Sequence, residues 1–169
     1  PANYPAALPG FGAKVYNTRN GKKIGVLNLQ GRTFMANIDC PFRTADREVS
    51  ELRSQTNLVV VDFHAEATSE KQAMGYYLDG RVGAVIGTHT HVQSADEKIL
   101  PNKTGFITDA GMTGGHYSVI GMDHAGAIQR FLTGVPNRLK ISNKEVKVCG
   151  VLMEFDSRDG SCKSIERIR

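Results

Sequence analysis

The fold of this chain is decided by the stretch Arg81–His91, which reads RVGAVIGTHTH. Its small and branched residues up to Gly87 are typical of a buried β-strand. His89 and His91 follow that strand and are two residues apart. Positions i and i+2 of an extended segment point to the same side. Both imidazoles are therefore predicted to aim at one region just beyond the end of the strand.

A second stretch, Leu58–Glu66, repeats the arrangement with the sequence LVVVDFHAE. An apolar run again leads to a polar end, here with His64 and Glu66. Neutral imidazole binds Zn, Fe, Mn and Ni, and a His-x-His pair at a strand end supplies two ligands at once. The two stretches together predict a metal site on the edge of a sheet, with His64, His89 and His91 as ligands. The alternative is that these histidines only hydrogen-bond loop backbone.

The order of the predicted elements indicates a mixed α/β fold in a single domain over residues 1–169. A hairpin turning at Asn20-Gly21 comes first, strands then alternate with helices, and an antiparallel meander closes the chain. The predicted strands occupy residues 14–18, 23–29, 58–64, 81–87, 105–108, 138–141, 145–155 and 163–168. The predicted helices occupy residues 44–55, 70–78 with a capping box of Ser69 and Gln72, and 124–132 between Asp123 and Gly134. This order implies a partly parallel sheet covered by helices, with its polar strand ends along one edge.

The composition favours a cytoplasmic protein with a real core. The chain has 169 residues, of which 40% are hydrophobic, and no apolar run approaches the roughly 20 residues needed to cross a bilayer. Its three cysteines, Cys40, Cys149 and Cys162, are widely spaced and fit neither a disulfide framework nor a zinc knuckle. The net charge of +4 is modest and the basic residues are dispersed, without the basic stripe of a nucleic-acid-binding protein.

The carboxylates near the predicted site do not complete it. A two-metal hydrolytic site needs a bridging ligand, which is usually a carboxylate. Asp62 and Glu66 are expected to support the ligands or cap a helix, and Asp96 and Asp109 are expected to form loop turns. The glycine-rich residues 111–115 are interpreted as a turn, and His116 and His124 as solvated side chains. The sequence thus offers three histidine ligands and no obvious bridge.

The motifs around the histidines closely resemble those of the bacterial YmdB-like metallophosphoesterases, in the calcineurin-like phosphoesterase superfamily. The resemblance covers essentially the whole chain and rests on residues 62–71 (DFHAEATSEK), 87–93 (GTHTHVQ), 108–114 (TDAGMTG), 28–32 (NLQGR) and 1–5 (PANYP). It implies a mixed β-sheet sandwich flanked by helices, with two metal ions at the sheet edge. Iron is common in the family, and manganese or zinc would suit the same ligands. His64 and His89 would bind one ion and His91 the other.

The resemblance also implies an activity. Members of the family hydrolyse small phosphodiesters, such as 2′,3′-cyclic AMP, with a metal-bridging hydroxide. They carry three further motifs, Gly-Asp, Asn-Gly-Glu-Asn and Gly-Asn-His, ahead of the Pro-Ala-Asn with which this chain begins. Those motifs supply the first Asp ligand, the bridging Glu, an Asn ligand and the His that assists the leaving group. None of them occurs in this chain, which therefore resembles the C-terminal two-thirds of such a protein.

Three expectations follow from that departure. The N-terminal strands of the fold and its catalytic His are expected to be missing, so the chain alone is predicted to be weakly active or inactive as a metal-dependent phosphodiesterase. Loss of those strands would expose sheet edges and core surface, which favours a homo-oligomer. The alternative function is a non-catalytic regulatory module that binds a nucleotide or phosphate.

Overall fold

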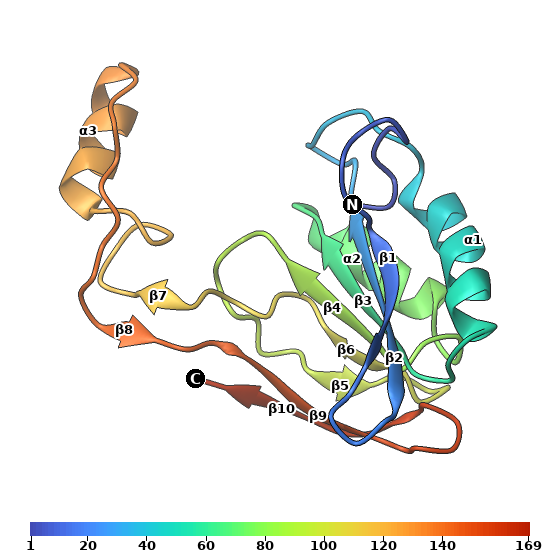
Figure 1. The fold of residues 1–169 in the computed structure, drawn as a ribbon. Helices are drawn as coiled ribbons and strands as arrows, with labels where there is room; N and C mark the ends of the chain where they lie inside the picture. Colours follow the sequence, from blue (N-terminus) through green and yellow to red (C-terminus); the bar gives the residue numbers. More distant parts are fainter.

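A six-stranded mixed sheet forms the centre of the structure, a computed structural model that describes residues 1–169 (Figure 1). The strands are β1 (Ala13–Asn17), β2 (Lys23–Gln30), β3 (Val59–His64), β4 (Ala84–Thr88), β5 (Lys98–Ile99), β6 (Gly105–Ile107), β7 (Gly114–Gly115), β8 (Val146–Lys147), β9 (Gly150–Phe155) and β10 (Cys162–Ile168). The helices are α1 (Pro41–Arg53), α2 (Thr68–Tyr77) and α3 (His124–Thr133). The sheet has the order β1-β2-β3-β4-β6-β5. Its four central strands are parallel, and β1 and β5 are antiparallel edges.

One face of the sheet is buried under α1 and α2. Alternate residues of the central strands point to this face, among them the fully buried Val61 and Phe63 of β3. Helix α1 places Val49 and Leu52 in the same core. Branched and aromatic side chains pack well on such a pleated surface, which explains why these short runs form strands here.

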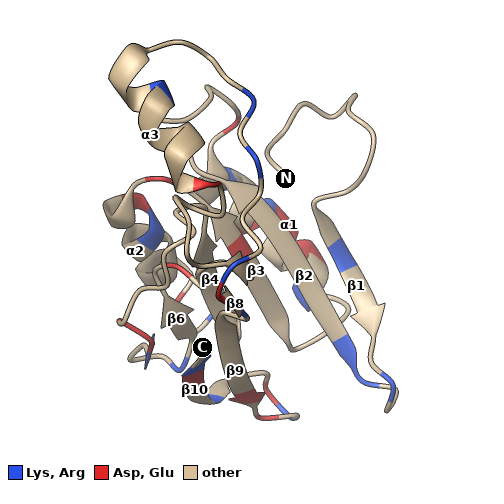
Figure 2. Cartoon of the chain, turned by 90° about the vertical axis from the view of Figure 1, so that its left-hand side faces the viewer, with Lys and Arg blue, Asp and Glu red and all other residues tan.

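The opposite face is covered only in part. The β9–β10 hairpin packs along β5 and β6 and forms a second layer, where Cys162 lies against Gly105. The rest of this face is less covered, so that Val26 is exposed and Val60 and Ile86 are half-buried. A separate arm carries α3 and the small β7–β8 ladder away from the sheet (Figure 1). Lys and Arg are spread over several elements, as the dispersed charge of the sequence predicts (Figure 2).

The structure confirms the mixed α/β layered fold and several local predictions. Strands β1 and β2 form the predicted antiparallel hairpin around Asn20-Gly21. Asp123 caps α3, because its side chain accepts hydrogen bonds from the backbone of Ala125 and Gly126. The same helix ends at Gly134, whose φ of 68° is the left-handed conformation that favours glycine at a helix end.

The predicted starts of the first two helices were wrong. Helix α1 begins at Pro41, three residues before the predicted start, because proline is well tolerated at the first helical position. Helix α2 begins at Thr68 with Ala67 as its N-cap and no side-chain cap hydrogen bond. The proposed capping box of Ser69 and Gln72 therefore does not form, since Ser69 already lies inside the helix.

The predicted closing meander is also only partly right. Strands β9 and β10 form its antiparallel core. Residues 138–141 lie on the arm and form no strand, apart from a single bridge between Ile141 and Met122. The predicted strand 145–155 is split, because β8 pairs with β7 rather than with β10. That partner consists of two glycines with no side-chain alternation, so no local pattern could reveal it.

A glycine in α2 tests how tightly the helix packs on the sheet. A Cβ at Gly75 would lie 2.5 Å from the Cδ2 atom of the buried Phe106 ring. Overpacking costs roughly 1–3 kcal/mol, which outweighs the gain of about 1 kcal/mol from alanine in a helix. We expect Gly75→Ala to lower the free energy of unfolding in urea. Gly126→Ala in α3, where the new Cβ meets Leu139 at an ordinary 3.5 Å, should cause no loss. Equal effects of the two substitutions would contradict this packing.

Candidate metal centre

The carboxyl ends of β2, β3 and β4 bring the predicted residues to one edge of the sheet. Gln30, His64 and Thr88 lie side by side in the register of the three strands. Two residues earlier, Asn28 of β2 lies beside Asp62 of β3. Parallel strands end at the same edge, so the apolar runs in the sequence deliver their polar ends to one place.

A line of hydrogen bonds joins these side chains across the partly covered face. The Asn28 amide donates to Asp62 Oδ2 at 2.8 Å, and the Thr88 hydroxyl donates to Asp62 Oδ1 at 2.9 Å. Thr88 Oγ1 also lies 3.1 Å from His64 Nδ1. Asp62 thus supports a predicted ligand through Thr88 and does not face the site itself.

His64 and His89 meet at the end of this line. His64 Nε2 and His89 Nδ1 are 2.9 Å apart, and the two rings are nearly perpendicular at 83°. The other ring nitrogen of His89, Nε2, lies 3.0 Å from Glu66 Oε2. Burial lowers the pKa of His64, and the nearby His89 lowers it further. Two of the three predicted ligands are therefore in direct contact, and the His64 imidazole favours its neutral, metal-binding form.

The spacing of this pair suits one metal ion. Imidazole nitrogens bind zinc at about 2.0–2.1 Å in tetrahedral geometry, so two of them on one ion lie about 3.3 Å apart. His64 Nε2 and His89 Nδ1 are hydrogen-bonded at 2.9 Å, so a shift of a few tenths of an ångström would bring them to that separation. No group of three or more His, Cys, Asp and Glu side chains is arranged to hold an ion. The residues present fit two neighbouring ligands of one ion and not a complete site.

His91 lies apart from the pair. Its Nδ1 atom is 2.9 Å from the carbonyl oxygen of Ile120, in the segment that leads to the arm. The prediction that the backbone stays extended beyond Gly87 was wrong, because β4 ends at Thr88 and the chain then turns. His89 has a φ of 114° and His91 a φ of 66°. Positive φ is uncommon for residues other than glycine and costs roughly 1–3 kcal/mol each, so contacts nearby must hold this turn.

A buried ion pair supplies those contacts. Lys71 Nζ lies 2.9 Å from Asp109 Oδ2 and donates to the carbonyl oxygen of Thr88 at 3.0 Å. Asp109 also accepts the backbone N–H groups of Thr90, at 3.0 Å, and Gly111, at 2.9 Å. The side chains of Lys71 and Asp109 are only 1% and 2% exposed. The pair fixes the backbone on both sides of His89.

Sequence reasoning missed Lys71 although the sequence held a signal for it. Lys71, Met74, Gly75 and Leu78 recur at helical spacing, and all four are buried. A lysine on the apolar stripe of a helix needs a buried partner. Gly87 makes room for this one, because a Cβ there would clash with the Thr108 carbonyl oxygen and lie 2.8 Å from Lys71 Cδ.

The other candidate residues have structural roles. Asp96 accepts a hydrogen bond from Ser94 two residues earlier, and Asp109 accepts one from Gly111 two residues later, which are local contacts of the kind predicted. Asp96 also binds Thr108, which is twelve residues away, so its role extends beyond a turn. His116 and His124 are half-buried rather than fully solvated. His116 Nε2 lies 3.2 Å from the Met112 carbonyl oxygen, and His124 packs on Tyr117.

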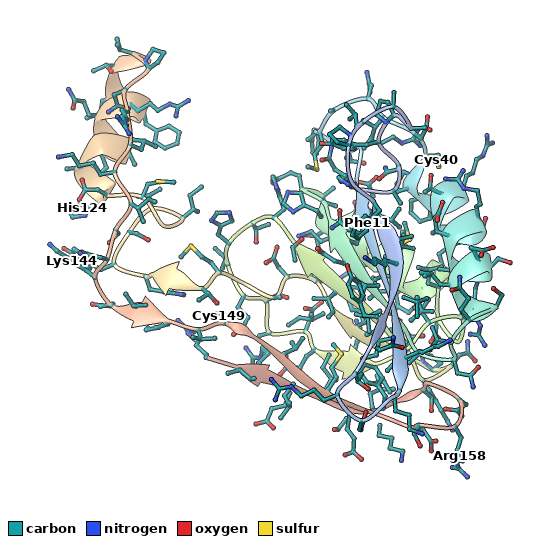
Figure 3. All side chains as sticks on the ribbon, viewed as in Figure 1. Phe11, Cys40, His124, Lys144, Cys149 and Arg158 are labelled. Carbon is teal, nitrogen blue, oxygen red and sulfur yellow. The ribbon has the colours of Figure 1, made fainter.

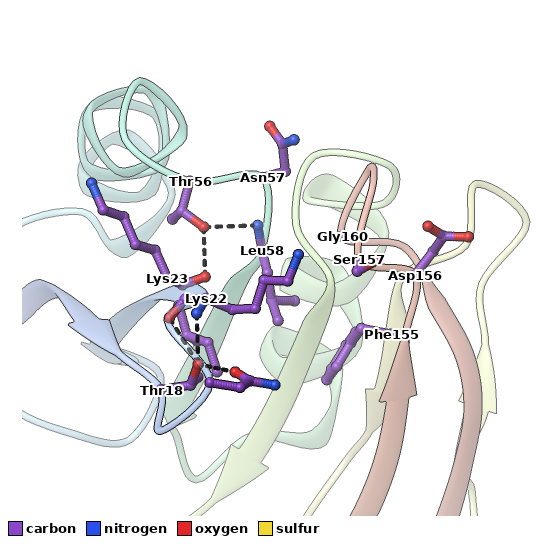
Figure 4. Close-up of a pocket in the computed structure, with 12 residues that line it drawn as sticks. Thr18, Lys22, Lys23, Thr56, Asn57, Leu58, Phe155, Asp156, Ser157 and Gly160 are labelled. Carbon is purple, nitrogen blue, oxygen red and sulfur yellow. Dashed lines mark hydrogen bonds between the residues drawn. The ribbon is translucent and has the colours of Figure 1, made fainter.

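Features elsewhere in the structure are separate from the histidine pair. A pocket of about 330 Å³ lies at the opposite edge of the sheet, between the β1–β2 turn and the β9–β10 turn, and contains no predicted site residue (Figure 4). All three cysteines are free, and Cys40 and Cys149 lie far apart (Figure 3). No helix has the length and apolar character needed to cross a bilayer.

The fold and the site define a class: a mixed α/β protein with histidines gathered at the carboxyl ends of parallel strands. The family described as "YmdB-like protein" matches residues 1–168, and the chain belongs to this family. It is 48% identical over 168 residues to the 2′,3′-cyclic-nucleotide 2′-phosphodiesterase of Bacillus subtilis, covering 99% of this chain and 63% of that protein.

Two solved structures share the fold. A hypothetical protein from Thermus thermophilus superimposes with a TM-score of 0.91 at 39% identity, covering 99% of this chain and 64% of that one. A phosphatase from Mycoplasma pneumoniae gives a TM-score of 0.89 at 34% identity, covering 99% of this chain and 61% of that one. This chain therefore spans slightly less than two-thirds of the length of these three relatives.

The buried ion pair generates a stability prediction. Lys71→Met removes one partner and leaves the Asp109 carboxylate buried without its counter-charge, which costs roughly 3–5 kcal/mol. We expect Lys71→Met/Asp109→Asn to lose less than Lys71→Met alone, because the neutral amide oxygen still accepts one backbone N–H. Urea unfolding of the wild type, both single variants and the double variant measures this coupling. Additive losses from the two single substitutions would show that the pair does not act as a unit.

Proposed function

We propose that this chain is the part of a metal-dependent phosphodiesterase that supplies the histidine ligands of its metal centre. The observation that carries the proposal is the His64–His89 pair, with ring nitrogens 2.9 Å apart at the edge of the parallel strands. The similarity to a Bacillus subtilis enzyme named as a 2′,3′-cyclic-nucleotide 2′-phosphodiesterase supports a small phosphodiester, such as a cyclic nucleotide, as the substrate class.

Each residue has a defined part in this proposal. His64 and His89 would hold one ion, and His91 would hold a second ion. Bound metal would supply Lewis-acid polarisation of the phosphoryl group and a more acidic water. Iron, manganese and zinc all accept such a ligand set. Glu66 orients His89 by its contact with the Nε2 atom of that ring. The Lys71–Asp109 pair holds the turn between His89 and His91.

The carboxylates at the site edge explain why the chain alone should be a poor enzyme. Both oxygens of Asp62 already accept hydrogen bonds, and Asp109 is committed to Lys71. Glu66 lies against His89. None of the three is available to bridge two ions. We therefore propose that the 169 residues bind metal but turn over a phosphodiester slowly or not at all.

The proposal also covers the cellular location of the protein and its association with a second copy. The free thiols are consistent with a reducing cytoplasm. The partly covered sheet face with Val26, Val60 and Ile86 favours association with a second copy. The alternative, a non-catalytic module that binds a nucleotide or phosphate at the same edge, is favoured by the lack of a free carboxylate there.

Zinc titration of the metal-free chain tests the ligands. We expect the tightest Zn²⁺ site to contain both His64 and His89. Loss of an imidazole should weaken this binding by at least about tenfold, since even the outer partners of a metal ligand contribute 10–100-fold. His64→Ala and His89→Ala should both show the loss in calorimetry. His124→Ala is the matched control, because His124 lies on the arm far from the sheet edge (Figure 3). Unchanged affinity in both site variants would exclude the proposed ligands.

Turnover separates the enzyme from the binding module. The metal-loaded chain should hydrolyse 2′,3′-cyclic AMP or bis(4-nitrophenyl) phosphate slowly or not at all. Any slow turnover should be lost in His89→Ala and retained in His124→Ala. Nucleotide binding with no turnover sensitive to His89 would favour the non-catalytic module. Turnover of the chain at the rate of an intact relative would contradict the proposal that it lacks a bridging ligand.

A further inference from the structure

We propose that Thr88 and Asp62 are positioning residues that fix His64 in the tautomer with its proton on Nδ1, so that Nε2 presents a free electron pair at the site edge. The inference deepens the proposed function. It rests on that function only for the role of Nε2 as a metal ligand. The position of the proton follows from the hydrogen bonds alone. It is therefore open to a test that needs no metal.

The argument begins at Asp62, which can only accept. Its Oδ2 receives the Asn28 amide at 2.8 Å and its Oδ1 receives the Thr88 hydroxyl at 2.9 Å. A carboxylate has no hydrogen to donate. The hydrogen between Thr88 Oγ1 and Asp62 Oδ1 therefore belongs to Thr88.

The second step concerns the Thr88 hydroxyl, which has a single hydrogen. Because that hydrogen points to Asp62, Thr88 Oγ1 can only accept from its other neighbour. That neighbour is His64 Nδ1, at 3.1 Å. His64 must therefore carry a hydrogen on Nδ1. In the neutral ring the electron pair then lies on Nε2, so the hydrogen of its 2.9 Å contact with His89 Nδ1 comes from His89.

The register of the parallel strands builds this relay into the sheet. Asn28 and Asp62 are paired neighbours on β2 and β3, and His64 and Thr88 are paired neighbours on β3 and β4. One step further from the site, the same face carries Val26 and Val60. On β2 and β3 the polar side chains of this face are thus confined to the two rows nearest the histidine pair. If they served only strand pairing, apolar branched residues would serve as well there.

Nitrogen NMR of the metal-free chain, with ¹⁵N-labelled histidine and at a pH where His64 is neutral, reads the proton position directly. We expect His64 Nδ1 to be protonated and Nε2 to be bare. Thr88→Val keeps the shape and removes the hydroxyl, so it should shift His64 toward the Nε2–H form. Thr88→Ser should restore the wild-type pattern. Thr133→Val is the matched control, because the Thr133 hydroxyl lies on the arm and contacts only the backbone of Gln129 and Val135.

The same variants give a readout on metal. Zn²⁺ affinity should fall roughly 10–100-fold in Thr88→Val and recover in Thr88→Ser, as for other partners that orient a metal ligand. A wild-type His64 protonated on Nε2, or an unchanged tautomer in Thr88→Val, would overturn the inference. A lost tautomer preference with unchanged Zn²⁺ affinity would overturn the positioning role. A wild-type chain with the expected tautomer and no Zn²⁺ binding would overturn the proposed function and leave the tautomer relay supported.

Discussion

The buried ion pair between Lys71 and Asp109 is the interaction on which the site depends. It joins α2 to the segments that follow β4 and β6, because Lys71 reaches both Asp109 and the Thr88 carbonyl oxygen. Burying two charges is costly unless every remaining hydrogen-bonding group is satisfied. Here the carboxylate also accepts two backbone N–H groups, those of Thr90 and Gly111. The ion pair thus holds the turn in which His89 adopts its unusual positive φ.

Thr88 connects the two sides of the sheet. Its carbonyl oxygen is bound by Lys71 from the helix-covered side, and its hydroxyl links Asp62 to His64 on the other face. Thr88 is therefore fixed by a hydrogen bond from the buried Lys71, and its own hydroxyl positions His64 on the neighbouring strand. The parallel register makes this possible, since it places His64 directly beside Thr88. The geometry of the His64–His89 pair is a consequence of the packing of the whole edge.

The sequence predicts the strands and the edge better than the contacts at that edge. Runs of branched residues that end in histidine are a local signal, and they locate His64 and His89 correctly at neighbouring strand ends. The direction of His91 depends on a turn fixed by Asp109, which is 18 residues further along the chain. The role of Thr88 depends on strand register, which the local pattern does not contain. Pairing of β8 with two glycines leaves no apolar alternation to detect.

The central claim is that the strand ends bring His64 and His89 close enough to bind one ion together. Anomalous diffraction at the zinc edge, from crystals of the chain grown with Zn²⁺, measures this directly. The account predicts one strong peak about 2.0–2.1 Å from both His64 Nε2 and His89 Nδ1. A zinc peak bound by only one of these nitrogens, or zinc bound only elsewhere on the chain, would contradict it.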